Sequence, residues 1–135
     1  MTFQLINPDS LGAPKGYSNG VLTEAGGRVL FVAGQIGWDA KQRIVSEDMV
    51  EQFDRALANV ITVVTEAGGQ PDQIARMVIY ITDRGAYLEN RSRIGERYRA
   101  RLGKHFPAMV LVEVKSLLDE HAKVEIEAVA VLSSK

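Results

Sequence analysis

The sequence predicts an α+β fold in which two helices pack on one face of a mixed β-sheet. An amphipathic helical pattern covers residues 46–67, and a second helical stretch covers residues 86–102. Apolar, β-branched segments precede, separate and follow them, which gives the order ββαβαββ. The 135 residues are enough for one domain and too few for two, so we expect a single domain over residues 1–135.

The first two strands are predicted to form a hairpin. Residues 17–24 and 28–36 are the two apolar segments, and Gly26-Gly27 lies between them. Glycine reaches the positive φ angles that tight turns need, so this pair predicts the turn.

The first helix is predicted from Ser46 to Ala67. Ser46 suits the N-cap, acidic residues follow in the first turn, and Gly68 suits the C-cap. The apolar residues recur in steps of three and four and form one stripe: Met49, Phe53, Ala56, Leu57, Val60, Val63, Val64 and Ala67.

The second half of the chain supplies three more strands and a helix. Residues 74–82 are apolar and β-branched and predict a strand, which Asp83-Arg84-Gly85 ends in a turn. A helix is expected over residues 86–102, with Gly103 as its stop. Residues 109–114 and 123–132 predict the last two strands.

Several of these strands are apolar on both faces. Val110, Leu111 and Val112 are consecutive, and so are the apolar residues of 29–33, 78–81 and 128–132. A sheet with helices on one face only should alternate polar and apolar residues. The uncovered apolar face therefore predicts a homo-oligomer, whose inter-subunit grooves are natural sites for a small molecule.

Composition excludes several classes of function. The chain has no cysteine, so disulfides, thiolate zinc sites and a cysteine nucleophile are excluded. The two histidines, His105 and His121, lack ligand spacing, and we expect neither a metal nor a cofactor. We see no signal peptide and no apolar run long enough to span a membrane, so a cytoplasmic location is expected.

Charge is unevenly distributed although the net charge is only −1. Residues 47–66 are acidic and residues 84–104 are basic. Arg93, Arg97 and Arg101 recur every four residues, a basic stripe that could contact nucleic acid. The acidic helix should lie alongside on the same face of the sheet, and Glu89 precedes Arg93 at the favourable i,i+4 spacing. Mutual neutralisation is therefore the preferred interpretation, and a nucleic-acid partner is not expected.

Six short motifs lie along nearly the whole chain. They are Gly16-Tyr17-Ser18-Asn19-Gly20-Val21, Leu30-Phe31-Val32-Ala33-Gly34-Gln35-Ile36, Tyr80-Ile81-Thr82-Asp83, Phe106-Pro107-Ala108, Val112-Glu113-Val114, and Val124-Glu125-Ile126-Glu127-Ala128-Val129-Ala130. Each is weak alone, but in their order and spacing they together resemble the RidA (YjgF, L-PSP endoribonuclease-like) superfamily.

The resemblance implies a chorismate-mutase-like homotrimer that hydrolyses reactive enamines and imines in clefts between subunits. It implies catalytic roles for Glu125, which would work with a water, and for Tyr17. The turn that lines the pocket corresponds to Gly34-Gln35, with Ala33 where the family has serine. Glu127, on the same face as Glu125, is expected to be structural.

Met109 stands where many relatives have an arginine that binds the substrate carboxylate. A charge-assisted hydrogen bond is worth about 1.5–3 kcal/mol, which a thioether cannot supply. A 2-aminoacrylate substrate is therefore disfavoured. Arg91 lies on the apolar stripe of the second helix with Tyr87, so we hypothesise that it supplies the missing charge. The alternatives are a snorkelling side chain or an ion pair with the acidic helix.

Trp38 and Met109 predict a more apolar pocket, with Leu111 and Tyr87 counted among its substrate-binding residues. Trp38 could stack on a planar substrate, or it could be an ordinary interface tryptophan. A flat substrate of the aminomuconate type fits this composition best.

Three hypotheses about function follow. The first is a cofactor-free deaminase of an enamine or imine that carries a carboxylate. The second is a non-catalytic trimer that binds a small metabolite. The third is an endoribonuclease or translation inhibitor, as the family label suggests.

Overall fold

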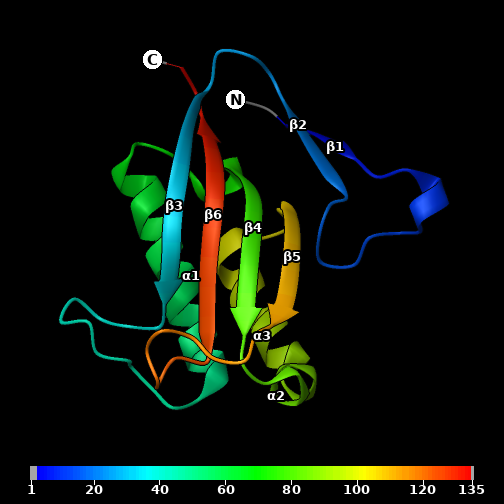
Figure 1. Ribbon diagram of the computed structural model, residues 1–135. Coiled ribbons are helices and arrows are strands. Elements are labelled where there is room, and N and C mark those ends of the chain that lie inside the picture. Colours follow the sequence, from blue (N-terminus) through cyan, green and yellow to red (C-terminus); the bar gives the residue numbers. More distant parts are fainter. Residues whose placement is uncertain (1–2, 135) are drawn as a thin grey trace.

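The computed structural model describes residues 3–134 and confirms the α+β fold (Figure 1). Its main sheet has four strands in the order β3-β6-β4-β5. These are β3 (Arg28–Ile36), β6 (Val124–Leu132), β4 (Ile74–Ile81) and β5 (Ala108–Glu113). Neighbouring strands are antiparallel except β4 and β5, which are parallel. The sheet is therefore mixed, as predicted.

Helices α1 (Met49–Glu66) and α3 (Arg91–Leu102) cover one face of this sheet and leave the other face open (Figure 1). The short helix α2 (Arg84–Glu89) lies at the end of the sheet, near the ends of β4 and β5. A short 3-10 helix, η2 (Pro71–Gln73), leads into β4. The core lies between α1, α3 and the sheet, where Phe53, Leu57 and Ile126 are fully buried.

Helix α1 forms where its apolar stripe predicted it, but Asp48 is the N-cap rather than Ser46. The Asp48 carboxylate accepts a hydrogen bond from the Val50 backbone N–H at 3.0 Å. Ser46 lies two residues earlier, and its hydroxyl accepts a hydrogen bond from the Asp48 N–H at 3.0 Å. Ser46 thus fixes the backbone at Asp48, and Asp48 caps the helix.

The single second helix that we predicted is wrong, because two helices meet at Asn90. Asn90 has φ −112° and ψ 14°, and its side chain donates to the Ala86 carbonyl at 2.8 Å. An asparagine amide that bonds nearby backbone competes with the helical ladder, which accounts for the break. Helix α2 begins at the N-cap Asp83, whose carboxylate accepts from the Ala86 N–H.

The predicted hairpin is also wrong, because β2 (Gly20–Thr23) does not pair with β3. It pairs instead with β1 (Phe3–Ile6), a strand that the sequence analysis missed. The two strands and the 3-10 helix η1 (Asp9–Leu11) form an N-terminal arm, residues 3–23, beyond the β5 edge (Figure 1). Gly26 does take the positive φ of a turn, +92°, but the chain after it enters the other sheet.

The helix-free face of the main sheet is apolar and exposed. Phe31 is 78% exposed, and Val29, Val110 and Val112 are exposed as well. The strands are thus apolar on both faces, as the sequence indicated. The homotrimer that would cover this face stays a prediction. Among the described residues, no helix is long and apolar enough to cross a membrane.

Candidate functional site

A groove of about 560 Å³ lies on the helix side of the sheet, between α3 and the β5 edge. Its volume falls in the range of small-molecule sites. Five of the predicted site residues line it: Tyr17, Tyr87, Arg91, Met109 and Leu111. The remaining lining residues are Lys15, Gly16, Phe53, Ile79, Ile94, Gly95, Tyr98, Arg99 and Phe106. The floor is therefore apolar, and the polar groups gather at the rim.

Tyr17 reaches this groove because its neighbour Ser18 ties the arm to the start of β5. The Ser18 hydroxyl donates to the Phe106 carbonyl at 2.6 Å, and its backbone N–H donates to the Pro107 carbonyl at 3.1 Å. Ser18 is only 3% exposed, so the attachment is buried. The sequence motif around Tyr17 thus has a structural reason, which is to hold the tyrosine over β5.

The rim of the groove is cationic and lacks a compensating acid. Lys15, Arg91 and Arg99 line it, and the lining contains no aspartate or glutamate. Within residues 3–134, none of these three cations forms an ion pair or a side-chain hydrogen bond. Burial raises the pKa of the Tyr87 hydroxyl, and the nearby Arg91 guanidinium partly opposes that shift. The groove can therefore receive an acidic group without displacing a protein carboxylate.

Arg91 is not buried, contrary to the expectation from helical spacing. It is the first residue of α3, just after the break at Asn90, and its side chain is exposed. The break rotates α2 relative to α3, so a spacing counted from Tyr87 through Arg91 does not follow one continuous helix. Arg91 nevertheless lines the predicted pocket, because the groove opens at this end of α3.

Glu125, the predicted catalytic carboxylate, lies on the opposite face of the sheet. It pairs in register with Tyr80 of β4, whereas Met109 pairs with Met77, which points into the core. The Glu125 carboxylate lies directly over Gly34, since a Cβ at that position would come within 2.0 Å of its Oε2 atom. Gly34 is thus required for Glu125 to take this position.

Glu127 and Tyr80 form a hydrogen-bonded pair next to Glu125. The Tyr80 hydroxyl donates to Glu127 Oε1, and this bond is the main reason that the pKa of Tyr80 is raised. The three residues, together with Gly34, line a shallow hollow of about 380 Å³ on the helix-free face. Glu127 thus has Tyr80 as its hydrogen-bond partner, whereas within residues 3–134 the Glu125 carboxylate forms no side-chain hydrogen bond or ion pair.

The remaining predicted residues lie apart from the groove. Ala33 and Gln35 flank Gly34 in an irregular stretch of β3, where the Gln35 amide donates to the Ala33 carbonyl at 3.0 Å. Trp38 lies beyond β3 in a bridge with Ile44, and it lines neither the groove nor the Glu125 hollow. A single protomer thus divides the predicted site between the two faces of its sheet.

The basic stripe on α3 is engaged by acids of α1. Arg93 pairs with Asp48 at 2.9 Å, Arg97 with Glu51 and Asp54, and Arg101 with Asp54 at 2.7 Å. The expected neutralisation between the two helices is therefore confirmed. The i,i+4 pair with Glu89 does not form, because Arg93 donates to Asn90 and Asp48.

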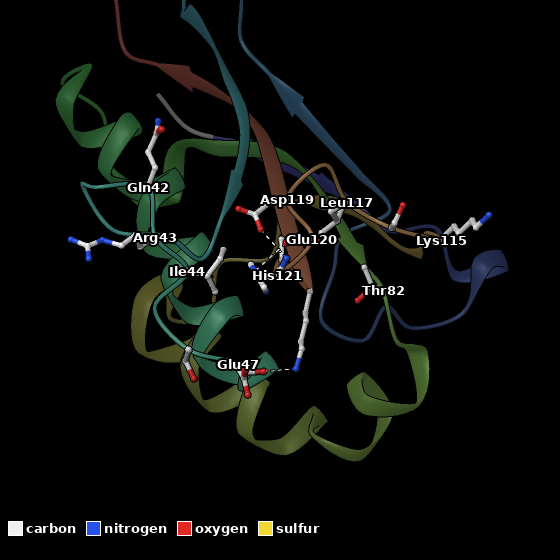
Figure 2. A pocket seen from close by; sticks show the side chains of 14 residues that line it. Gln42, Arg43, Ile44, Glu47, Thr82, Lys115, Leu117, Asp119, Glu120 and His121 are labelled. Atoms are coloured by element: carbon white, nitrogen blue, oxygen red, sulfur yellow. Dashed lines mark hydrogen bonds and ion pairs between the residues drawn. The ribbon is translucent and has the colours of Figure 1, made fainter.

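A larger hollow, about 890 Å³, lies between two loops at the far end of the sheet (Figure 2). Figure 2 shows Arg43 and Glu47 on one side and Asp119, Glu120 and His121 on the other. Acids and bases are mixed along it, and the Lys123 ammonium donates to the Glu47 carbonyl across it. None of the predicted site residues lines it, and we consider the apolar, cationic groove the better candidate for a ligand site.

Nine of the lining residues were not predicted as site residues, and among them Lys15 and Arg99 add the charge and Gly95 the space beside Arg99. For Gly95 and Arg99 the signal was their four-residue spacing from Arg91, which puts all three on one face of a helix. Among residues 3–134, no group of three or more histidine, aspartate or glutamate side chains is arranged to hold a metal ion.

Comparison with known proteins identifies the family. The model of the family described as Endoribonuclease L-PSP matches residues 8–132, nearly the whole chain. The chain therefore belongs to the RidA/YjgF superfamily.

Three relatives illustrate this membership. The 2-iminobutanoate/2-iminopropanoate deaminase of Salmonella typhimurium is 33% identical over 108 residues, which cover 78% of this chain and 80% of that protein. The structure of YyfB from Yersinia pestis, of the conserved Rid family, matches with a TM-score of 0.86 at 29% identity, covering 98% and 100% of the two chains. Escherichia coli TdcF with bound serine matches with a TM-score of 0.67 at 32% identity, covering 90% and 92%.

Proposed function

We propose that this protein hydrolyses the C=N bond of a small imine or enamine that carries a carboxylate, in clefts between the three copies of a homotrimer. The observation that supports this most directly is the groove beside β5, with its apolar floor, three tyrosines and unopposed cations. A similar protein bears the name 2-iminobutanoate/2-iminopropanoate deaminase, which is consistent with this chemistry.

The groove needs a carboxylate that its own protomer holds on the other face of the sheet. The exposed apolar surface around Phe31 and Val110 favours packing of helix-free faces against one another. Such packing would carry Glu125 of a neighbouring protomer towards the β5 edge, where the groove opens. In this proposal Tyr17, Arg91 and Met109 come from one copy and Glu125 from the next.

The reaction needs only water and a proton shuttle. Water adds to the imine carbon, so a C–O bond forms and the C=N π bond breaks. Glu125 accepts the proton of that water and returns it to the nitrogen of the resulting carbinolamine. The carbinolamine hydroxyl then gives its proton to the nitrogen, the C–N bond breaks, and ammonia leaves as the C=O bond forms. An enamine would first gain a proton at carbon and lose its N–H proton, which gives the imine. Tyr17 would orient the substrate, and Arg91 would hold its carboxylate.

The groove favours a larger and flatter substrate than 2-iminopropanoate. Met109 and Leu111 contribute apolar surface where a short substrate would need an arginine, and Tyr87 offers a half-buried ring. We therefore propose a substrate of the aminomuconate type.

The test is ammonia release by the purified protein from an aminoacrylate generator and from 2-aminomuconate. We expect release from both with a preference for 2-aminomuconate, and a loss of at least about a hundredfold in Glu125→Gln. The matched control is Glu127→Gln, on the same strand and face, which should keep most of the activity. Analytical ultracentrifugation should show the same trimer for all three proteins.

Three outcomes would overturn the proposal. No ammonia from either substrate, with intact trimers, would favour the binding protein. RNA cleavage that disappears in Glu125→Ala while the trimer persists would favour the endoribonuclease. A monomer at low micromolar concentration would remove the proposed cleft.

A further inference from the structure

Arg99 is exposed, and its guanidinium lies back along its own helix towards Gly95. Its Nη1 atom sits 3.0 Å from where a Cβ on Gly95 would be. Side chains on a helix lean towards its N-terminus, so a residue covers the position four before it. Here that position is a glycine, and the guanidinium fills the space that a side chain would occupy. Both Gly95 and Arg99 line the groove.

Gly95 needs an explanation of its own, because it lies in the middle of α3. Glycine in a helix interior costs about 1 kcal/mol relative to alanine. Its φ is not in the left-handed region, so the backbone does not require it. Outside the helix backbone and the adjacent residues, the three heavy atoms nearest to a Cβ at this position all belong to the Arg99 guanidinium. The observed position of Arg99 is thus a structural reason for glycine here.

The two arginines line the groove at different levels along α3. The Arg99 guanidinium lies level with Gly95, and Arg91 is one further turn, about 6 Å, towards the start of the helix. Arg91 and Tyr87 both line the groove, and the Arg91 charge acts on the pKa of Tyr87. Apolar side chains of Ile94, Met109 and Leu111 line the groove between them.

We propose that Arg99, placed by Gly95, is a second anion-binding residue, so that the groove takes a flat or apolar molecule with acidic groups at both ends. Arg91 would bind one acidic group, and Arg99 with Lys15 would bind the other. This proposal rests on the proposed function, because it takes the groove to be the substrate site. It adds the class of substrate that the groove binds, and it concerns binding alone.

The charge pattern of the groove supports two anionic groups over one. Each cation is exposed and unpaired within residues 3–134, and a single carboxylate would leave the cation at the other end without a partner. A diacid would neutralise both ends while its apolar middle stayed on the floor of the groove.

The test compares two unreactive acids of nearly equal shape by titration calorimetry on the whole protein. These are trans,trans-muconate, which has a carboxylate at each end, and sorbate, which has a methyl group in place of one carboxylate. We expect muconate to bind about tenfold tighter or more, because it makes one more charge-assisted hydrogen bond. Equal affinities would overturn the inference.

Variants locate the second contact. Arg99→Ala should reduce muconate affinity to that of sorbate and leave sorbate affinity unchanged, whereas Gly95→Ala should weaken muconate alone. The matched control is Lys104→Ala, which removes one positive charge just beyond α3 without touching the groove. Arg99→Ala that keeps the full muconate preference would contradict the role of Arg99.

This result is separable from that of the deaminase test. A muconate preference that depends on Arg99 would uphold the inference even if no ammonia were released from any imine. Conversely, ammonia release with equal binding of muconate and sorbate would uphold the proposed activity and overturn this inference.

Discussion

Helix α3 carries five arginines in two rows, and the two rows have different surroundings. Arg93, Arg97 and Arg101 face α1 and pair with its acids. Arg91 and Arg99, spaced by eight with Gly95 midway, face the groove and have no protein carboxylate beside them in the described residues. Both rows follow the same four-residue spacing, so residue type and period do not distinguish them.

The difference shows that a basic helix takes its role from what lies opposite each face. Asp48, Glu51 and Asp54 lie on the side of α1 that faces α3, and there the arginines form ion pairs that join the two helices. Where β5 presents Met109 and Leu111, the arginines remain available to a ligand. We therefore expect substitutions in the paired row, Arg93, Arg97 and Arg101, to change stability, and those in the groove row, Arg91 and Arg99, to change ligand binding.

Asp54 should matter most for stability, because two arginines depend on it. Its side chain is only 19% exposed and accepts from Arg97 at 3.0 Å and from Arg101 at 2.7 Å. Asp54→Ala should lower the free energy of unfolding by about 1–2 kcal/mol, since it leaves two guanidinium groups without their acceptor. Urea denaturation followed by circular dichroism measures this change.

The groove row supplies the control for this experiment. Arg99→Ala should change the free energy of unfolding by no more than about 0.5 kcal/mol, because an exposed side chain without a protein partner is removed. Equal losses in the two variants would show that the two rows do not differ in the proposed way.

Acid should weaken the paired row. The hydrogen bond from Arg101 is the largest cause that holds the pKa of Asp54 below its ordinary 3.8, and the hydrogen bond from Arg93 does the same for Asp48. A carboxyl whose pKa is lower when folded stabilises the fold above its unfolded pKa. That stabilisation is lost as the pH falls from about 4 through the lowered folded value.

Melting curves between pH 7 and pH 2 test this with Asp54→Asn, which keeps an acceptor but cannot ionise. The difference in melting temperature between wild type and variant should be largest above pH 5 and should shrink below pH 4. A difference that stays constant down to pH 2 would show that ionisation of Asp54 does not contribute.

Gly95→Ala should make the helix more stable while it weakens binding of a diacid. Alanine gains up to about 1 kcal/mol over glycine in a helix interior. The new methyl group meets only the flexible end of Arg99, which can shift aside, so most of that gain should appear in the free energy of unfolding. Reduced stability in thermal melts would mean that Gly95 serves the packing of α3 rather than the position of Arg99.

The sequence predicted those parts of the structure that depend on local spacing. The stripe from Met49 to Val64 predicted α1, and alternating charge blocks predicted its pairing with α3. The motifs around Tyr17, Gly34 and Glu125 identified the family, whose model matches most of the chain.

The parts that failed depend on which distant segments meet. Gly26-Gly27 predicts a turn, but no local pattern specifies that β2 pairs with β1 instead of β3. The sequence placed Met109 and Glu125 in one inter-subunit pocket. Strand register puts them on opposite faces of one protomer's sheet, so this pocket would need residues of two protomers and stays a prediction. Asn90 could have predicted the helix break. Without that break, helical spacing predicted a buried Arg91, whereas its side chain is exposed.

The smallest expected effect is that of Arg93, the most exposed member of the paired row. Its side chain is 53% exposed and that of Asp48 is 39% exposed, so solvent weakens their attraction. Exposed ion pairs contribute about 0.2–1 kcal/mol, and Arg93→Ala should fall in this range with a loss that shrinks at 1 M salt. Arg91→Ala is the matched control on the binding row and should leave the unfolding curve unchanged at either salt concentration. A salt-independent loss in Arg93→Ala would indicate that its contribution comes from the hydrogen bond to Asn90, which joins α3 to the break, rather than from its charge.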